Sequence, residues 1–289
     1  MKLFFTNKVY HFLTVSRFLN TIGSSLYNIV SVIYAATVFH SKIMVGVANV
    51  TMVIPALSFM LSALVILVIK DDADYDVLSS DNELSFKEQF SNLYHNVMLI
   101  FNETNSADFI HLLLAILCLN MLSGSLNAIY NIWLLFAKIG HLSYSQALLL
   151  IEFILVGGIL IGSLTPHDYF SQKSIRQLLK ISAVIFFIVG LLNLIHFPLI
   201  IGILLLAFAS YLVGKVNPKI NSQLLSNLLA NTLAQTNSFL TFLFTLFLPV
   251  GTVLFSSLSS WNITSTWITF LALAVAVFKL SASTKTVVD

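Results

Sequence analysis

One polar line runs along the first apolar segment of the chain. Its members, spaced three or four residues apart, are Thr14, Arg17, Thr21, Ser24, Asn28 and Ser31. That spacing places side chains on one face of a helix. An arginine or asparagine facing hydrocarbon is costly, so this face should meet other helices or a water-filled pathway. Together with Asn20, which lies beside it in the sequence, the line predicts part of a substrate pathway.

Later apolar segments carry similar polar rows. The row in residues 109–136 consists of Asn120, Ser123, Asn127 and Asn131, and the row in residues 199–226 consists of Ser210, Gly214, Asn217 and Asn221. Two interpretations stay open. The asparagines Asn120, Asn127, Asn131 and Asn217 could line a shared substrate pathway, or they could hold helices together through hydrogen bonds worth about 0.6–2 kcal/mol each.

Glu152 is the strongest single candidate for a residue that binds and releases a proton. It lies near the middle of an apolar segment, residues 144–164, with no basic residue within one helical turn of the sequence. A carboxyl group at that depth favours its protonated form. If it gains and loses a proton as its surroundings change, it could couple transport to protons. The alternative is a protonated or hydrogen-bonded glutamate that serves packing alone.

Two lysines flank a proline in a later apolar segment. Lys215 and Lys219 stand on either side of Asn217-Pro218, where the proline removes a backbone hydrogen bond of the helix. A helix interrupted there could bind anions through its lysines. The alternative is that the lysines mark the cytoplasmic end of the helix.

The composition is that of an integral membrane protein. Of the 289 residues, 58% are apolar and only 9% are charged, against about 25% charged in soluble domains. The chain has no phosphate loop, dinucleotide glycine pattern, paired-histidine zinc motif or nucleophile elbow. We therefore expect no enzyme activity, cofactor, metal or nucleic-acid partner. The one cysteine, Cys118, is read as an apolar packing residue.

The apolar runs predict an all-α membrane protein with about eight spans. Each run is long enough, or nearly so, for the roughly 30 Å of bilayer hydrocarbon. The expected spans are residues 9–39, 43–69, 109–136, 144–164, 178–197, 199–226, 237–257 and 261–280. Between the second and third spans, residues 70–108 should form a cytoplasmic linker, acidic at first. From Ser85 it becomes an amphipathic helix lying on the membrane or docking on a partner.

Basic residues predict the orientation of these spans. With the N-terminus inside, only Lys42 and Lys138 of the 14 basic residues fall outside. This distribution favours a multi-pass protein of the cell membrane with both termini, including the tail 281–289, in the cytoplasm.

The run Ser16-Arg-Phe-Leu-Asn-Thr-Ile-Gly-Ser-Ser-Leu-Tyr-Asn28 resembles the first helix of major facilitator superfamily exporters of the macrolide-efflux and siderophore-export branch. Residues 109–280 resemble the C-terminal six-helix half of those proteins. Within them, Gly157-Gly-Ile-Leu-Ile-Gly162 and the following loop with Asp168, Lys173 and Arg176 resemble that half's second helix and its loop motif. The resemblance implies proton-coupled efflux of a small amphipathic molecule.

The chain departs from that family in length. The superfamily has twelve spans in two six-helix bundles, whereas residues 1–69 offer only two helices before the linker. An internal loss of about four spans would explain this. A homo-oligomer or a second chain would then have to complete the pathway, because alternating access needs two bundles. The alternative is a truncated membrane protein that does not transport, or a membrane-bound interaction module.

Overall fold

The computed structural model describes residues 30–39, 41–51, 94–98, 101, 106–165, 167–195, 199–227 and 230–282. The regular elements in this part are all helical: α3 (Lys42–Thr51), α6 (Ser106–Trp133), α7 (Tyr144–Leu164), the short 3-10 helix η1 (Phe170–Gln172), α8 (Ile175–Leu194), α9 (Leu199–Asn227), α10 (Ala230–Trp261) and α11 (Ile263–Leu280). Residues 30–39 are also helical. The all-α prediction is confirmed for the described residues.

Six helices, α6 to α11, contain stretches long and apolar enough to cross a membrane. They correspond to the last six predicted spans. The first two predicted spans, 9–39 and 43–69, are helical at residues 30–39 and 42–51, and the rest of them lies outside the described residues. The same holds for most of the linker 70–108, in which residues 94–98 are helical.

Capping residues move two helix boundaries away from those that hydrophobicity predicted. The Oγ of Ser174 accepts a hydrogen bond from the Gln177 backbone, and the Gln177 side chain accepts one from the Ser174 backbone. This capping box starts α8 at Ile175, three residues before the predicted start. Similarly, Asn262 caps α11, so Trp261 belongs to α10 and not to the last helix as predicted.

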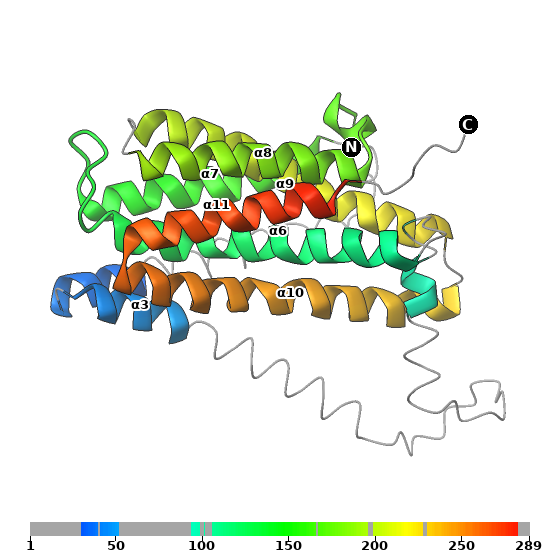
Figure 1. Cartoon of the computed structure of the whole chain (residues 1–289), viewed down its shortest axis with the longest axis horizontal. Coiled ribbons are helices and arrows are strands. Elements are labelled where there is room, and N and C mark those ends of the chain that lie inside the picture. Colours follow the sequence, from blue (N-terminus) through cyan, green and yellow to red (C-terminus); the bar gives the residue numbers. More distant parts are fainter. Residues whose placement is uncertain are drawn as a thin grey trace, which may run out of the picture.

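The six long helices lie side by side, and successive helices run in alternating directions (Figure 1). The most extensive contacts join α6 to α10 and α7 to α9. In addition, α8 packs on α9 and α11, and α11 also packs on α6. The short helix α3 packs against α10 and α6.

Glycines bring α7 and α9 into backbone contact. A Cβ atom at Gly162 would overlap the carbonyl oxygen of Tyr211, and one at Gly214 would overlap that of Ile159. Between them, the Oγ of Ser163 donates a hydrogen bond to the Gly214 carbonyl at 3.1 Å. Since lipid provides no hydrophobic force between helices, such close packing and interhelical hydrogen bonding are what hold them together.

Helices α6 and α10 are also brought into backbone contact by glycines. A Cβ atom at Gly124 would lie 2.9 Å from the Leu248 carbonyl oxygen, and one at Gly251 would overlap that of Met121. The Oγ1 of Thr252 donates to the Gly124 carbonyl at 3.2 Å. This contact matches the α7–α9 contact residue for residue.

Two numbering offsets, which differ by one residue, relate the two halves of the bundle. The offset from α6 to α9 is 90 residues, which takes Met121 to Tyr211 and Gly124 to Gly214. The offset from α7 to α10 is 89 residues, which takes Ile159 to Leu248 and Gly162 to Gly251. Because α6 and α9 run in opposite directions, helices α6–α8 and α9–α11 form two inverted repeats.

An aromatic cluster lies near one end of the bundle, between α6, α8 and α11. Trp267 of α11 packs edge-on against Tyr130 and Trp133 of α6, with ring centroids 5.9 and 5.5 Å apart. The Asn193 amide of α8 donates to the Tyr130 hydroxyl at 3.0 Å. These fully buried contacts tie the two repeats together.

Gly214→Ala should destabilise the protein by about 1–3 kcal/mol, because the added methyl group forces α7 and α9 apart. Gly157→Ala is the matched control: a Cβ atom there meets nothing within 4 Å. It should be neutral or stabilising, since alanine favours a helix over glycine. Thermal unfolding in detergent compares the two variants. An equal loss of stability in both would contradict the close packing of α7 on α9.

Candidate functional site

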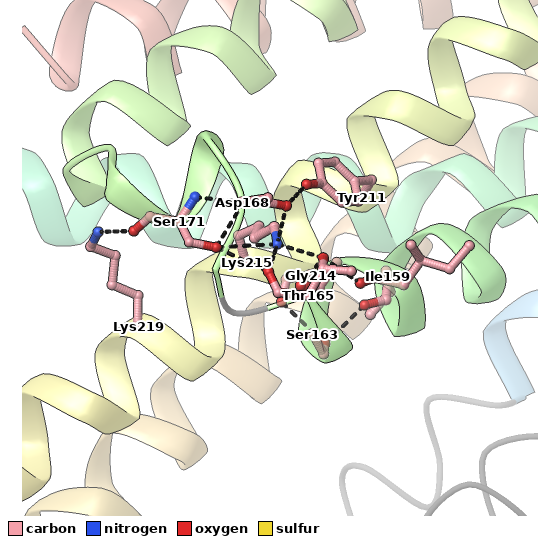
Figure 2. Close-up of polar contacts among 11 residues, drawn as sticks. Ile159, Ser163, Thr165, Asp168, Ser171, Tyr211, Gly214, Lys215 and Lys219 are labelled. Carbon is pink, nitrogen blue, oxygen red and sulfur yellow. Dashed lines mark hydrogen bonds and ion pairs between the residues drawn. The ribbon is translucent and has the colours of Figure 1, made fainter. Parts of the chain in front are cut away.

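A charged network fastens the α7–α8 connection, residues 165–174, to the side of α9. Lys215 of α9 approaches Asp168 of the connection, with Nζ and Oδ2 2.6 Å apart (Figure 2). The lysine is only 5% exposed, whereas the carboxylate side chain keeps 27% of its surface accessible. A buried ammonium needs such a partner, because an unpaired charge in the interior is costly.

Polar neighbours complete the surroundings of this ion pair. Lys215 Nζ also donates to the carbonyl and to the Oγ1 of Thr165, the latter at 2.6 Å. Asp168 Oδ1 accepts hydrogen bonds from the backbone and the hydroxyl of Ser171, both at 2.8 Å. The hydroxyl of Tyr211 donates to Asp168 Oδ2. We call these five residues, Thr165, Asp168, Ser171, Tyr211 and Lys215, the latch.

Lys219 lies one turn further along α9 and extends the attachment. It donates to the carbonyl oxygens of Ser171, at 3.0 Å, and of Lys173 (Figure 2 shows the contact with Ser171). The Lys173 ammonium lies over the Tyr169 ring, 4.2 Å from its centroid. The sequence left two interpretations of Lys215 and Lys219, anion binding or the cytoplasmic end of a helix. The contacts show a further role, because both lysines bind the α7–α8 connection. Helix α9 continues through Pro218.

The pKa of Asp168 reflects these partners. Burial alone would raise it, but the hydrogen bonds from Lys215 and Ser171 and the lysine charge outweigh burial and lower the pKa to about 2. The carboxylate therefore stays ionised over the whole physiological pH range, and the latch does not respond to pH within it.

The asparagine row of α6 lies on a partly covered face of that helix. Asn120, Asn127 and Asn131 are half-buried, whereas their sequence neighbours Leu119 and Leu126 are fully buried. Each of these three residues is thus packed against its neighbours over most of its surface, while a part of it stays accessible.

One end of the row adjoins a pocket. The hydroxyl of Tyr144, the first residue of α7, donates to the Asn131 carbonyl at 2.7 Å. Tyr144 also lines a pocket of about 560 Å³ formed by the α6–α7 connection, with Lys138 and His141. Through Tyr144, the C-terminal end of the asparagine row is therefore joined to the wall of this pocket.

The other predicted site residues are placed as follows. Glu152 lies half-buried on α7, between the buried Ile151 and the exposed Phe153. Asn217 lies on α9, two residues beyond Lys215, and its side chain is outside the described part. The pathway residues predicted on the first helix, Arg17, Asn20, Thr21, Ser24 and Asn28, lie outside the described residues.

Sequence reasoning missed the latch as a unit. Asp168 and Lys215 were each visible, one in a short connection and the other in an apolar helix, but their pairing was not proposed. The usable signal is a lysine deep in an apolar helix, which requires a carboxylate or several oxygen atoms nearby. Among the described residues, no group of three or more His, Cys, Asp or Glu side chains could hold a metal ion.

Comparisons with protein-family models, with curated proteins and with solved structures return no match.

Asp168→Asn should lower the free energy of unfolding by about 2 kcal/mol, since the Lys215 ammonium keeps its oxygen neighbours but loses its counter-charge. Lys215→Met should cost a similar amount, and the double variant should cost less than the sum of the two. Thermal unfolding in detergent measures all three. A loss of stability in the double variant equal to the sum of the two single losses would contradict a direct ion pair between Asp168 and Lys215.

The latch also predicts a pH dependence. Because the folded pKa of Asp168, about 2, lies below its ordinary value of about 4, the ion pair contributes stability above about pH 4 and loses it as the pH falls toward 2. The difference between the native chain and Asp168→Asn should therefore be constant from pH 5 to pH 8. A difference that vanished within that range would show that Asp168 titrates there.

Proposed function

We propose that the protein is a membrane transporter of the major facilitator type that exports a small amphipathic molecule in exchange for protons. The observation that carries the proposal is the half-buried asparagine row of α6 within a bundle of six apolar helices. Partly accessible amides in such a bundle supply hydrogen-bond donors and acceptors to a polar solute. The hydrocarbon of the bilayer has no such groups.

The latch suits a transporter because it keeps one end of the bundle rigid. Asp168 and Lys215 fix the α7–α8 connection to α9, so that α7, α9 and their connection would move as one body. Transport by rocking of helical bundles needs such bodies. Under the proposed orientation, with both termini in the cytoplasm of a cell-membrane protein, this end is the cytoplasmic one.

Proton coupling is assigned to Glu152. It is the one acidic residue within the helix α7, and it is half-buried at about the middle of that helix. A carboxyl group that exchanges its proton as the helix environment changes would link substrate movement to the proton gradient.

The pathway would be completed by a second chain or a second copy of this one. The described helices α6–α11 amount to one bundle, and rocking needs another. If none is provided, the alternative function follows: a truncated membrane protein that binds partners and does not transport.

Cells that produce the protein should retain less of a lipophilic dye than cells with the empty vector, and a proton uncoupler should abolish the difference. Glu152→Gln should abolish proton-driven efflux, because the amide cannot exchange a proton. Glu88→Gln, which removes a carboxylate outside the predicted spans, is the matched control and should keep efflux. Dye retention followed by fluorescence measures each case.

Two results would overturn parts of the proposal. Retention equal to that of empty-vector cells, for every dye of a panel, would leave the non-transporting alternative. Uncoupler-sensitive efflux that persists in Glu152→Gln would keep the transporter but remove Glu152 from the coupling mechanism.

A further inference from the structure

The pocket at the α6–α7 connection has the size of a ligand site. Its volume is about 560 Å³, within the range of about 300–1,000 Å³ that is usual for sites of small ligands. Its wall consists of residues 134–144 together with Gln146 and Ala147, so the connection and the first turn of α7 form it jointly. Gly140, with a φ of 56°, supplies the left-handed backbone conformation at which the connection turns back.

Most polar side chains of the pocket wall already bond to other groups of the protein. The Ser143 hydroxyl and the Gln146 side chain form the capping box of α7, and the Tyr144 hydroxyl donates to a carbonyl oxygen of α6. The side chains of Lys138 and His141 are exposed and make no hydrogen bond or ion pair within the described part of the chain. Their N–H groups therefore remain available to a ligand with acceptor oxygens.

The charge around the pocket is positive. No carboxylate belongs to its wall. The acidic side chains of the described residues lie elsewhere: Asp108 in the first turn of α6, Glu152 within α7, and Asp168 beside Lys215. Lys42, exposed at the start of α3, adds a further ammonium at the pocket end of the bundle (Figure 1). The charges of the described residues therefore attract an anion to this end.

Helix length places the pocket at the headgroup level of a bilayer. Helix α7 has 21 residues and begins in the pocket wall, at Tyr144. At about 1.5 Å per residue it is about 30 Å long, which is the thickness of the hydrocarbon region. Its first residue therefore marks the boundary between hydrocarbon and headgroups. Phe136 and Leu142 of the same wall are exposed and offer apolar surface beside the two basic side chains.

We propose that this pocket binds the phosphate headgroup of an acidic phospholipid. The Lys138 ammonium forms a charge-assisted hydrogen bond with the phosphate, and the His141 ring donates a second hydrogen bond. The glycerol backbone of the lipid contacts Phe136 and Leu142, whose apolar surface a dissolved phosphate would leave uncovered. The site goes beyond the transport function and does not depend on it, because it needs only the helix bundle and the bilayer.

Binding of single lipids to the purified full chain tests this site. Phosphatidylglycerol is added to the protein in an uncharged detergent, and mass spectrometry of the intact complexes gives the Kd of the first bound lipid. Lys138→Gln should raise this Kd about tenfold, because it removes the charge-assisted hydrogen bond. His141→Ala should raise it about threefold, because a neutral hydrogen bond contributes less. Thermal unfolding without lipid should be unchanged in both variants, since neither side chain bonds to another described group.

Lys42→Gln and Lys279→Gln are the matched controls. Each removes one exposed lysine that is not part of the pocket wall, the first at the pocket end of the bundle and the second in the last turn of α11, at the other end. Each should change the Kd of phosphatidylglycerol by less than about twofold. Phosphatidylcholine with the same acyl chains should bind about tenfold more weakly than phosphatidylglycerol, because its choline cation would meet Lys138 without a carboxylate to balance it.

Three results would overturn the proposal. A loss of affinity in either control equal to that in Lys138→Gln would show that the lipid does not bind in the pocket. Equal Kd values for the two lipids would show that the acidic headgroup is not recognised. Displacement of phosphatidylglycerol by glycerol 3-phosphate, a soluble phosphate ester, at concentrations near the lipid Kd would identify a dissolved phosphate as the ligand. Because no dye efflux enters these measurements, a failure of the transport function leaves their outcome unaffected.

Discussion

Close approach of helix backbones through glycine is the constraint on which the rest of the bundle depends. Gly162 and Gly214 let α7 and α9 touch, and Gly124 and Gly251 do the same for α6 and α10. In each pair a hydroxyl group donates to a glycine carbonyl, which fixes the register of one helix against the other. In lipid, where burial of apolar surface does not drive helices together, these contacts decide the arrangement. Both the latch and the asparagine rows are positioned by that register.

The two repeats agree in packing and differ in charge. Lys215 directly follows Gly214 on α9, and the corresponding residue of α6 is Ser125, which donates to the carbonyl of Leu122 in its own helix. Only the α9 repeat therefore carries an ammonium that can hold a connection through Asp168. The tight turn between α10 and α11, where Asn262 alone separates the helices, takes the place of the long α7–α8 connection. One end of the bundle is fastened by charge and the other by a short turn.

Apolar run length was enough to predict the helical class and the six spans of residues 106–280, because a bilayer demands long apolar segments. The helix ends depended on caps such as Ser174 and Asn262, which hydrophobicity does not report. Helical spacing predicted the α6 asparagine row, since its members lie on one helix. The Asp168–Lys215 pair joins residues far apart in the sequence, so only tertiary packing reveals it. The two repeats share identical residues at only a few positions of the sequence. The glycine contacts were therefore needed to align one repeat with the other.

Distances between spin labels test the inverted repeat most directly. Leu114 of α6 and Val253 of α10 correspond to Leu204 of α9 and Leu164 of α7, and all four side chains are exposed. Double electron–electron resonance on one sample labelled at Leu114 and Val253, and on a second labelled at Leu204 and Leu164, should give distance distributions with the same maximum. A third sample labelled at Leu114 and Leu164, which the repeat does not relate to the first, serves as the reference. Clearly different maxima in the first two samples would contradict the account of two matched, glycine-packed helix pairs.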